Sequence, residues 1–357
     1  MSSSPSVGAE TTRAAPIQRP IAAGGSRFGV RISGSGSAIP QTRLTNKDLE
    51  QLMDTTDEWI TQRTGIRTRH VFKHDLGETT ARLATQASMA AVADAGLSPS
   101  DIDLVIVASM TPDAPTPSVS CMVSSALGTQ KAGAMDINAA CSGFVYCMNV
   151  AHDLIRGGSY RNVLVIGADR ITRHVDFSTY GRATAVLFGD GAGAVVLRRT
   201  DDHTKGLIAQ AMFSDGSGAK HLYIPASKAD FPDGDAFEER KIGFVQMNGS
   251  AVFKFAVGTF SRLIEQTLES AGIGPTDVDH YVCHQSNARI LEAARERFGL
   301  PPEKLHVNID RYGNTVAASV PLVFDEIRRA GRVREGHKVM FLAFGAGLTW
   351  GSSLWQV

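Results

Sequence analysis

Short apolar runs alternate along the chain with longer stretches in which apolar positions recur three or four residues apart. Residues 104–108, 161–168 and 337–344 consist largely of consecutive apolar residues, and we predict three buried strands there. Residues 79–95 have helical spacing, and residues 141–158 are apolar nearly all round and end at two glycines, which predicts a buried helix. This alternation predicts an α/β fold with mainly parallel sheets covered by helices.

The pattern also repeats along the chain. "AGLSPSDIDLVIVAS" (95–109) and "AGIGPTDVDHYVCHQ" (271–285) share a helix end, a proline turn, Asp-x-Asp and a strand. The offset that takes position 95 to position 271 also takes 161–168 to 337–344, and Asn138 to Asn314. Because three matches share one fixed offset, we predict two copies of one α/β unit.

The predicted halves are residues 28–204 and 205–357, with helix 249–272 interpreted as the long counterpart of 141–158. Residues 1–27 are rich in Ser, Ala, Pro and Gly with a single acidic residue, which predicts a disordered tail. The expected location is cytoplasmic, or an organelle stroma if this tail, with three arginines and little acid, is a transit peptide.

The composition narrows the functional classes. Lys plus Arg and Asp plus Glu both total 36 among 357 residues, so no global field would attract nucleic acid or a membrane surface. No apolar run approaches the roughly 18 residues that a bilayer-spanning helix needs. The four cysteines form no CxxC pair and no zinc spacing, and so few thiols in so long a chain indicate a reducing compartment.

Three residues are candidates for chemistry. Cys141 begins the predicted buried helix, where the helix dipole and free N–H groups favour a thiolate. His284 ends a strand of the second copy, and ligand sites of α/β sheets favour that end. If the halves pack around a pseudo-twofold axis, the loop of Asn314 faces that of Cys141. A neutral histidine and an asparagine are donors suited to a developing oxyanion.

Each candidate also has a purely structural interpretation. Cys141 alone would be a small buried hydrophobe, His284 a core histidine and Asn314 a helix cap. The joint placement of the three favours function. "GDGAG" (189–193) looks like a phosphate loop, but the strand-like "AVVLRR" follows it where a helix should begin, so we assign no nucleotide.

Six motifs identify a family. The stretches "DTTDEWITQRTGIRTRH", "INAACSGFVY", "LFGDGAGAVVL", "HQSNARI", "YGNTVAASVP" and "FGAGLTWGSSL" resemble the β-ketoacyl-acyl-carrier-protein synthase III family, from about residue 28 to 357. The resemblance implies a thiolase-like five-layered αβαβα fold built from two duplicated α/β halves. It implies no metal and no other cofactor.

The resemblance also implies an initiating condensing enzyme of type II fatty acid synthesis. An acyl group would pass from acyl-CoA to Cys141 and condense with malonyl-acyl-carrier protein, giving 3-oxoacyl-carrier protein, CO2 and CoA. His284 and Asn314 would bind the enolate oxygen, and the backbone N–H groups of Cys141 and Ala346 would form the oxyanion hole. A homodimer is implied.

Further positions follow from the same motifs. The resemblance implies substrate-binding roles along the CoA path for Trp59, Arg63, Arg182, Gly249, Phe253 and Asn287, and carrier-protein docking for Lys254 and Arg289. Thr116 stands where many relatives place a phenylalanine from the partner subunit, which predicts a larger acyl pocket. The stretch 226–241 is longer than usual, and no role is predicted for it.

Other classes of function fit parts of the pattern. An acyltransferase of this fold that acts on an amine or alcohol in secondary metabolism would use Cys141 and His284 without needing decarboxylation. The presence of Asn314 argues for condensation. A degenerate scaffold has no reason to keep all three residues, and the duplicated pattern argues against a Cys-His-Asn protease.

Overall fold

The structure, a computed structural model, describes residues 21–22, 28–129, 131–233 and 236–357 and contains two five-stranded sheets. The first sheet has the order β2-β8-β7-β5-β6 and the second β1-β9-β14-β13-β12. The first consists of β2 (Gly29–Ala38), β5 (Leu104–Ala108), β6 (Gly133–Ile137), β7 (Asn162–Asp169) and β8 (Gly191–Thr200). The second consists of β1 (Ile21–Ala22), β9 (Gly206–Ser214), β12 (His280–Cys283), β13 (Lys338–Gly345) and β14 (Thr349–Gln356).

Both sheets are mixed, so the prediction of mainly parallel sheets is wrong. Among the described strands of these sheets, β5 with β6, β5 with β7, and β12 with β13 pair in parallel, and the other neighbours are antiparallel. The reason is the connection: β13 returns directly into β14 without a crossover helix, and parallel neighbours need such a crossover. Apolar content alone does not reveal strand direction.

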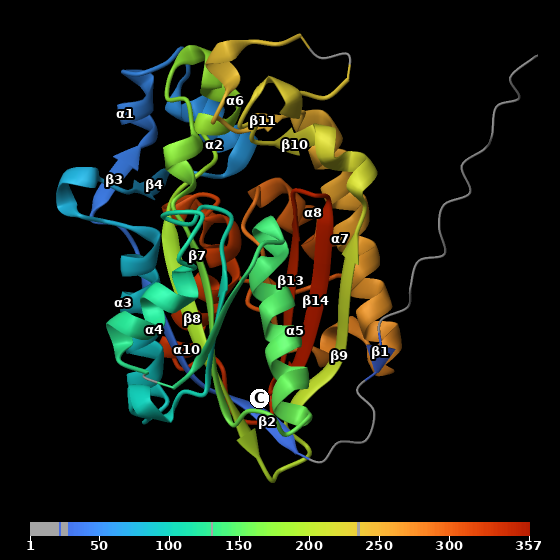
Figure 1. Cartoon of the computed structure of the whole chain (residues 1–357). Coiled ribbons are helices and arrows are strands. Elements are labelled where there is room, and N and C mark those ends of the chain that lie inside the picture. The colour runs from blue at the N-terminus through green and yellow to red at the C-terminus, as the bar shows by residue number, and fades with distance from the viewer. Residues whose placement is uncertain (1–20, 23–27, 130, 234–235) are drawn as a thin grey trace, which may run out of the picture.

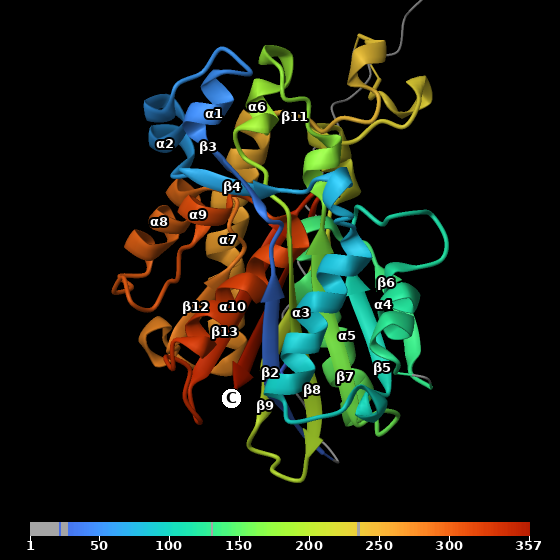
Figure 2. The ribbon, with the colours of Figure 1, turned by 90° about the vertical axis from the view of Figure 1, so that its left-hand side faces the viewer.

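Helices occupy three layers around the two sheets, as Figures 1 and 2 show. Helices α5 (Gly143–Arg156) and α10 (Ser319–Arg329) contact strands of both sheets and lie between them. Helices α3 (Thr80–Asp94) and α4 (Val119–Leu127) cover the outer face of the first sheet. Helices α7 (Gly249–Ala271) and α8 (Ala288–Arg297) lie on the second-sheet side. The predicted five-layered αβαβα architecture is confirmed.

The internal repeat is visible in the element boundaries. Strands β7 and β13 begin at 162 and 338 and end at 169 and 345, so both bounds differ by the predicted offset. Helices α5 and α10 begin at 143 and 319, which is the same offset again. The counterpart of α5 is therefore α10, and our pairing of helix 249–272 with 141–158 is wrong. We propose the boundary between the halves at 204/205, in the connection from β8 to β9.

Burial explains why α5 and α10 form the centre. Apolar side chains of α5 such as Phe144, Val145 and Met148 are fully buried, and they pack with Phe324 of α10 and Trp355 of β14 in one core between the sheets. Each such side chain contributes roughly 1.5–3 kcal/mol when removed from water. A helix that is apolar on all sides can bury all of its faces only in this middle layer.

Shorter elements form a cap over one end of the sheets, drawn at the top of Figure 1. They include hairpin β3–β4 (Thr42–Thr45, Thr68–Val71), helices α1 (Asn46–Glu50), α2 (Asp57–Thr64) and α6 (Arg182–Ala185), and hairpin β10–β11 (Leu222–Tyr223, Gln246–Met247). Helix α9 (Ile309–Tyr312) lies beside β4. Of the stretch 226–241, the described residues 226–233 and 236–241 lie in the connection between β10 and β11.

The predicted tail and its interpretation as a transit peptide fall almost entirely outside the described residues. Within it the structure describes Ile21–Ala22, which pair antiparallel with β9. Across the described ranges, none of the helices combines the length and the apolar character needed to cross a bilayer.

Candidate active site

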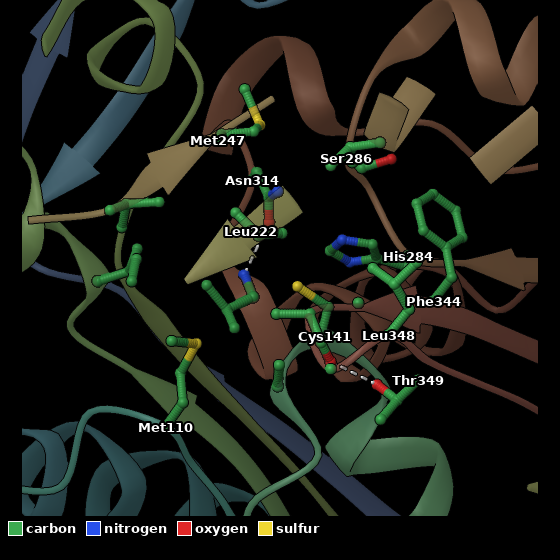
Figure 3. A pocket seen from close by; sticks show the side chains of 18 of the residues that line it. Met110, Cys141, Leu222, Met247, His284, Ser286, Asn314, Phe344, Leu348 and Thr349 are labelled. Carbon is green, nitrogen blue, oxygen red and sulfur yellow. Dashed lines mark hydrogen bonds between the residues drawn. The ribbon is translucent and has the colours of Figure 1, made fainter. Parts of the chain in front are cut away.

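Cys141, His284 and Asn314 line one cavity of about 610 Å³ beneath the cap. The cysteine follows β6 and the histidine follows β12, so both lie at the carboxyl ends of strands. In Figure 3 the Cys141 sulfur points into the cavity, with His284 on one side and Asn314 on the other. The structure thus brings together three residues that are far apart in the sequence.

Two equivalent turns present this site. Cys141 lies in the 3-10 turn Ala140–Ser142 before α5, and its counterpart is the turn Val316–Ala318 before α10. Ala140 (φ 46°) and Val316 (φ 53°) are the positive-φ non-glycine residues among those described, and they occupy equivalent positions in the two copies. Such a backbone costs of order 1–3 kcal/mol and occurs mainly at functional sites.

The Cys141 thiol is the one candidate whose electrostatics differ from our expectation. Its side chain is buried, and burial, aided by the nearby Asp169 carboxylate, raises the pKa of Cys141 to about 12. The prediction of a resting thiolate is therefore wrong. The helix terminus favours the anion, but desolvation of the buried thiol has the larger effect on its pKa.

His284 is held as a neutral donor. Its Nδ1 lies 2.6 Å from Ser319 Oγ, and that oxygen also accepts a hydrogen bond from the Gln285 N–H at 3.3 Å. When the hydroxyl proton of Ser319 is donated to Nδ1, the ring proton sits on Nε2, and this is the tautomer we propose. Burial lowers the pKa of His284 to about 3, so the ring is uncharged near neutral pH. The Phe344 ring packs edge-on at 5.5 Å between centroids.

The Asn314 side chain is oriented by the backbone of the turn that follows it. Its Oδ1 accepts a hydrogen bond from the Val316 N–H at 2.9 Å, which leaves the amide NH2 as the group available to a ligand. Its main chain bonds to Leu187 O at 2.8 Å and accepts from the Gly189 N–H at 3.0 Å. The capping interpretation is wrong, because Thr315 is the N-cap of the turn Val316–Ala318 and Ala318 that of α10. Asn138 holds the N–H of Ala140 in the same way at 3.3 Å.

The turn after β13 lies against Cys141. A Cβ placed on Gly345 would lie 2.7 Å from the Cys141 nitrogen, so only glycine leaves that amide uncovered. Ala346, the other predicted oxyanion donor, lines the same cavity. The two backbone N–H groups therefore belong to segments in direct contact.

Three of the residues predicted to lie along the CoA path also line the cavity. Gly249 and Phe253 lie in the first turns of α7, and Asn287 precedes α8. Asn287 has a structural role as well, because its Oδ1 caps α8 and its Nδ2 donates to Arg63 O at 3.1 Å. Lys254 and Arg289 are exposed close to these residues, and the Arg289 guanidinium lies 5.5 Å from the centroid of the Phe253 ring.

The predicted CoA-flanking residues come together at the cap. The Arg182 guanidinium lies 5.4 Å from the Trp59 ring centroid, and its Nη1 donates to Asp54 O at 2.6 Å. Arg63 is exposed one helical turn after Trp59 on α2. Thr116 is exposed and lies outside the cavity wall of its own chain.

The glycines of "GDGAG" serve packing. A Cβ at Gly189 would lie 2.3 Å from Tyr312 O, and β8 begins at Gly191. Residue patterns did not reveal Ser319 or the apolar wall around Cys141, which includes Met110, Ile171, Leu222 and Val316. Ser319 lies within the quoted motif "YGNTVAASVP", but no local feature indicates its histidine partner.

Known proteins resemble the chain along most of its length. The family model described as 3-oxoacyl-[acyl-carrier-protein (ACP)] synthase III matches residues 135–216, and its C-terminal model matches 268–357. A beta-ketoacyl-[acyl-carrier-protein] synthase III of Caldanaerobacter subterraneus is 45% identical over 323 residues, 90% of this chain and 96% of that protein.

Solved structures agree with this similarity. A 3-oxoacyl-[acyl-carrier-protein] synthase III from Aquifex aeolicus superposes with a TM-score of 0.84 at 41% identity, covering 92% of this chain and all of that one. The priming beta-ketosynthase of the R1128 polyketide pathway reaches the same TM-score at 34% identity, covering 95% of this chain and 98% of its own.

The fold and a cysteine-based site at its strand ends define a thiolase-like condensing enzyme, an enzyme of the acyltransferase type. Within that class the similarity spans nine tenths of the chain. The chain belongs to the β-ketoacyl-[acyl-carrier-protein] synthase III family.

Proposed function

We propose that this chain performs the initiating condensation of type II fatty acid synthesis, with Cys141, His284 and Asn314 as its catalytic residues. The observation that carries the proposal is their convergence on one cavity, with a thiol between two neutral hydrogen-bond donors. Those donors suit an oxyanion but cannot act as general bases.

In the first half-reaction the Cys141 sulfur attacks the thioester carbonyl of acyl-CoA. A C–S bond to Cys141 forms, the C–S bond to CoA breaks, and the thiol proton passes to the departing CoA sulfur. The backbone N–H groups of Cys141 and Ala346 stabilise the oxyanion of the tetrahedral intermediate. The protonated resting thiol fits this balance, because the leaving group needs a proton.

In the second half-reaction malonyl-carrier protein replaces CoA in the tunnel. Its carboxylate leaves as CO2, and the C–C bonding electrons move onto the thioester as an enolate. His284 Nε2–H and Asn314 Nδ2–H donate to the enolate oxygen. The enolate carbon attacks the acyl carbonyl, the bond to Cys141 breaks, and the thiolate takes a proton from solvent.

Substrate binding follows the path from the cap to the cavity. Trp59 and Arg182 offer a ring and a guanidinium plane for the CoA adenine, and Arg63 lies nearby on α2. Gly249, Phe253 and Asn287 line the passage for the pantetheine arm. Lys254 and Arg289 present positive charge beside its opening, which suits an acidic carrier protein.

A homodimer is part of the proposal. Strand β6 is the outer strand of the first sheet and pairs only with β5 among the described strands, so its other edge is open to a second copy. In such a dimer the exposed Thr116 would face the partner's acyl pocket. The bacterial origin of the relatives supports a cytoplasmic location.

Intact mass spectrometry tests the proposal. The chain is incubated with acyl-CoAs of increasing length and branching, and then with malonyl-carrier protein. We expect one acyl adduct that is lost when the malonyl substrate is added, together with a new 3-oxoacyl-carrier protein. Cys141→Ser should abolish the adduct, whereas loading that persists on Cys121, Cys147 or Cys283 would contradict the assignment. An adduct that moves only to amines or alcohols would support the alternative acyltransferase.

A further inference from the structure

The two halves differ at one position beside their equivalent turns. Gly345 ends β13 and leaves the Cys141 amide uncovered, whereas Asp169, at the equivalent place in the first half, ends β7. The counterpart of Cys141 in the other half is Ala317, and the Asp169 Oδ2 accepts a hydrogen bond from the Ala317 N–H at 3.1 Å. A protein carboxylate thus binds the amide equivalent to the one we propose as an oxyanion donor.

The environment of Asp169 is built for an anion. Its side chain is 1% exposed. Its Oδ1 accepts from the Met110 N–H (2.9 Å), the Thr111 N–H (3.1 Å), the Thr111 Oγ1 (2.8 Å) and the Ser109 Oγ (3.2 Å). With Ala317 this makes five donors, a set that favours the ionised, acceptor-only form of the carboxylate. Burial raises the pKa of Asp169 to about 6, which still leaves the carboxylate mostly ionised at neutral pH.

These donors connect two walls of the cavity. Met110 lines the apolar part beside Cys141, as Figure 3 shows. Ala317 directly follows Val316, whose N–H holds the Oδ1 of Asn314. The Asp169 carboxylate therefore joins the segment that contacts the acyl group to the turn that orients the asparagine.

We infer that Asp169 is a positioning residue, which keeps the Met110 segment and the Asn314 turn in register by filling the position over the Ala317 amide that corresponds to the oxyanion hole at Cys141. The inference rests on the proposed function, because it concerns the reaction that Asn314 assists. No contact of Asp169 with substrate is required. Its effect is transmitted through Ala317 and Val316 to the Asn314 amide.

Asp169→Asn tests the inference with little change in shape. The amide oxygen must face the four donors of the Met110 segment, so the NH2 group faces the Ala317 N–H, and two donors then oppose each other. We expect the rate of malonyl-carrier-protein decarboxylation to fall about tenfold or more, the effect of roughly 1.4 kcal/mol on a barrier. Acyl loading of Cys141, measured by intact mass, should fall less than about threefold, since no oxyanion donor moves and loss of the Asp169 charge, which raises the pKa of Cys141, does not hinder ionisation of the thiol.

The matched control is Asp325→Asn. Asp325 lies elsewhere on α10 and is also 1% exposed. It accepts hydrogen bonds from Ser35 and Ser37 of β2 and from Arg329. This variant should lower the unfolding temperature and leave the ratio of the two half-reaction rates unchanged. A drop in that ratio in both variants would mean that any buried carboxylate has the same effect, and the inference would fail.

A second variant keeps the test decisive if Asp169→Asn does not fold. Asp169→Ser opens space over the Ala317 amide, and added formate supplies a carboxylate that fits it. Formate, but not chloride, should then raise decarboxylation relative to loading. The absence of such rescue, or an equal loss of both half-reactions in Asp169→Asn, overturns the inference. A wild-type chain that loads but never discharges would instead contradict the proposed function.

Discussion

Ser319 Oγ lies 2.6 Å from Nδ1 of His284, and we propose that this contact sets the tautomer of the histidine. The same oxygen accepts the Gln285 N–H, and donation of its own proton to Nδ1 leaves the ring proton on Nε2. The two residues come from different elements, since Ser319 begins α10 and His284 follows β12. Local sequence around either residue does not predict the pair.

Ser319→Ala should impair decarboxylation but spare acyl loading. Without the hydroxyl donor the Nδ1–H tautomer becomes competitive, and Nε2 then faces the enolate oxygen as an acceptor. We expect decarboxylation to slow by about 2- to 12-fold, the effect on the barrier of the roughly 0.5–1.5 kcal/mol of one hydrogen bond. Histidine ¹⁵N shifts report the tautomer directly. Nδ1 protonation in the wild-type chain would disprove this role, and Ser261→Ala, a buried serine of α7, is the control.

Asn314→Ala separates the two half-reactions. Loss of one oxyanion donor costs about 2.7–4 kcal/mol in comparable sites, so decarboxylation should fall about 10²–10³-fold while acyl-Cys141 still forms. Stopped-time mass spectrometry of the acyl adduct and CO2 release measure the two rates. Asn149→Ala removes another buried asparagine, one that donates to Ser352 O in the core. Equal loss of both rates in Asn314→Ala would assign it a structural role only.

The raised pKa of Cys141 predicts how alkylation depends on pH. Since burial raises the pKa to about 12, the thiolate fraction grows throughout the neutral and mildly alkaline range. The rate of iodoacetamide labelling of Cys141 should therefore rise about tenfold per pH unit from pH 7 to 10 without a plateau, because only the thiolate reacts. Peptide mass spectrometry identifies the labelled cysteine. A plateau below pH 8 would restore the thiolate that the helix terminus suggests.

Trp59→Ala should weaken CoA binding without changing the chemistry. It removes the ring next to the Arg182 guanidinium, a contact of about 0.5–2 kcal/mol when formed around a ligand. We expect KM for acyl-CoA to rise about 3- to 30-fold, with discharge of preformed acyl-Cys141 by malonyl-carrier protein unchanged. Leu52→Ala, an exposed cap residue, is the control. A slower discharge would show that Trp59 also shapes the cavity.

Several parts of the fold could be predicted because they depend on local pattern or on the repeat. The strand Leu104–Ala108 and the helix over 249–272 have apolar spacings that specify them. The constant offset between the copies relates elements of the same backbone shape. Strand direction could not be predicted, because the connections between strands decide it. The pairing of α5 with α10 follows from the same offset, and our assignment of 249–272 as the counterpart of 141–158 overlooked it.

The sequence by itself determined the duplicated α/β architecture and the candidate trio Cys141, His284 and Asn314, since periodicity and motif residues are properties of the chain. Only the tertiary structure decided the protonation and orientation of that trio. The Cys141 pKa depends on burial, the His284 tautomer on Ser319, and the Asn314 amide on Val316 and, through Ala317, on Asp169. Desolvation and hydrogen bonding act through space, between groups that the chain brings together only when it folds.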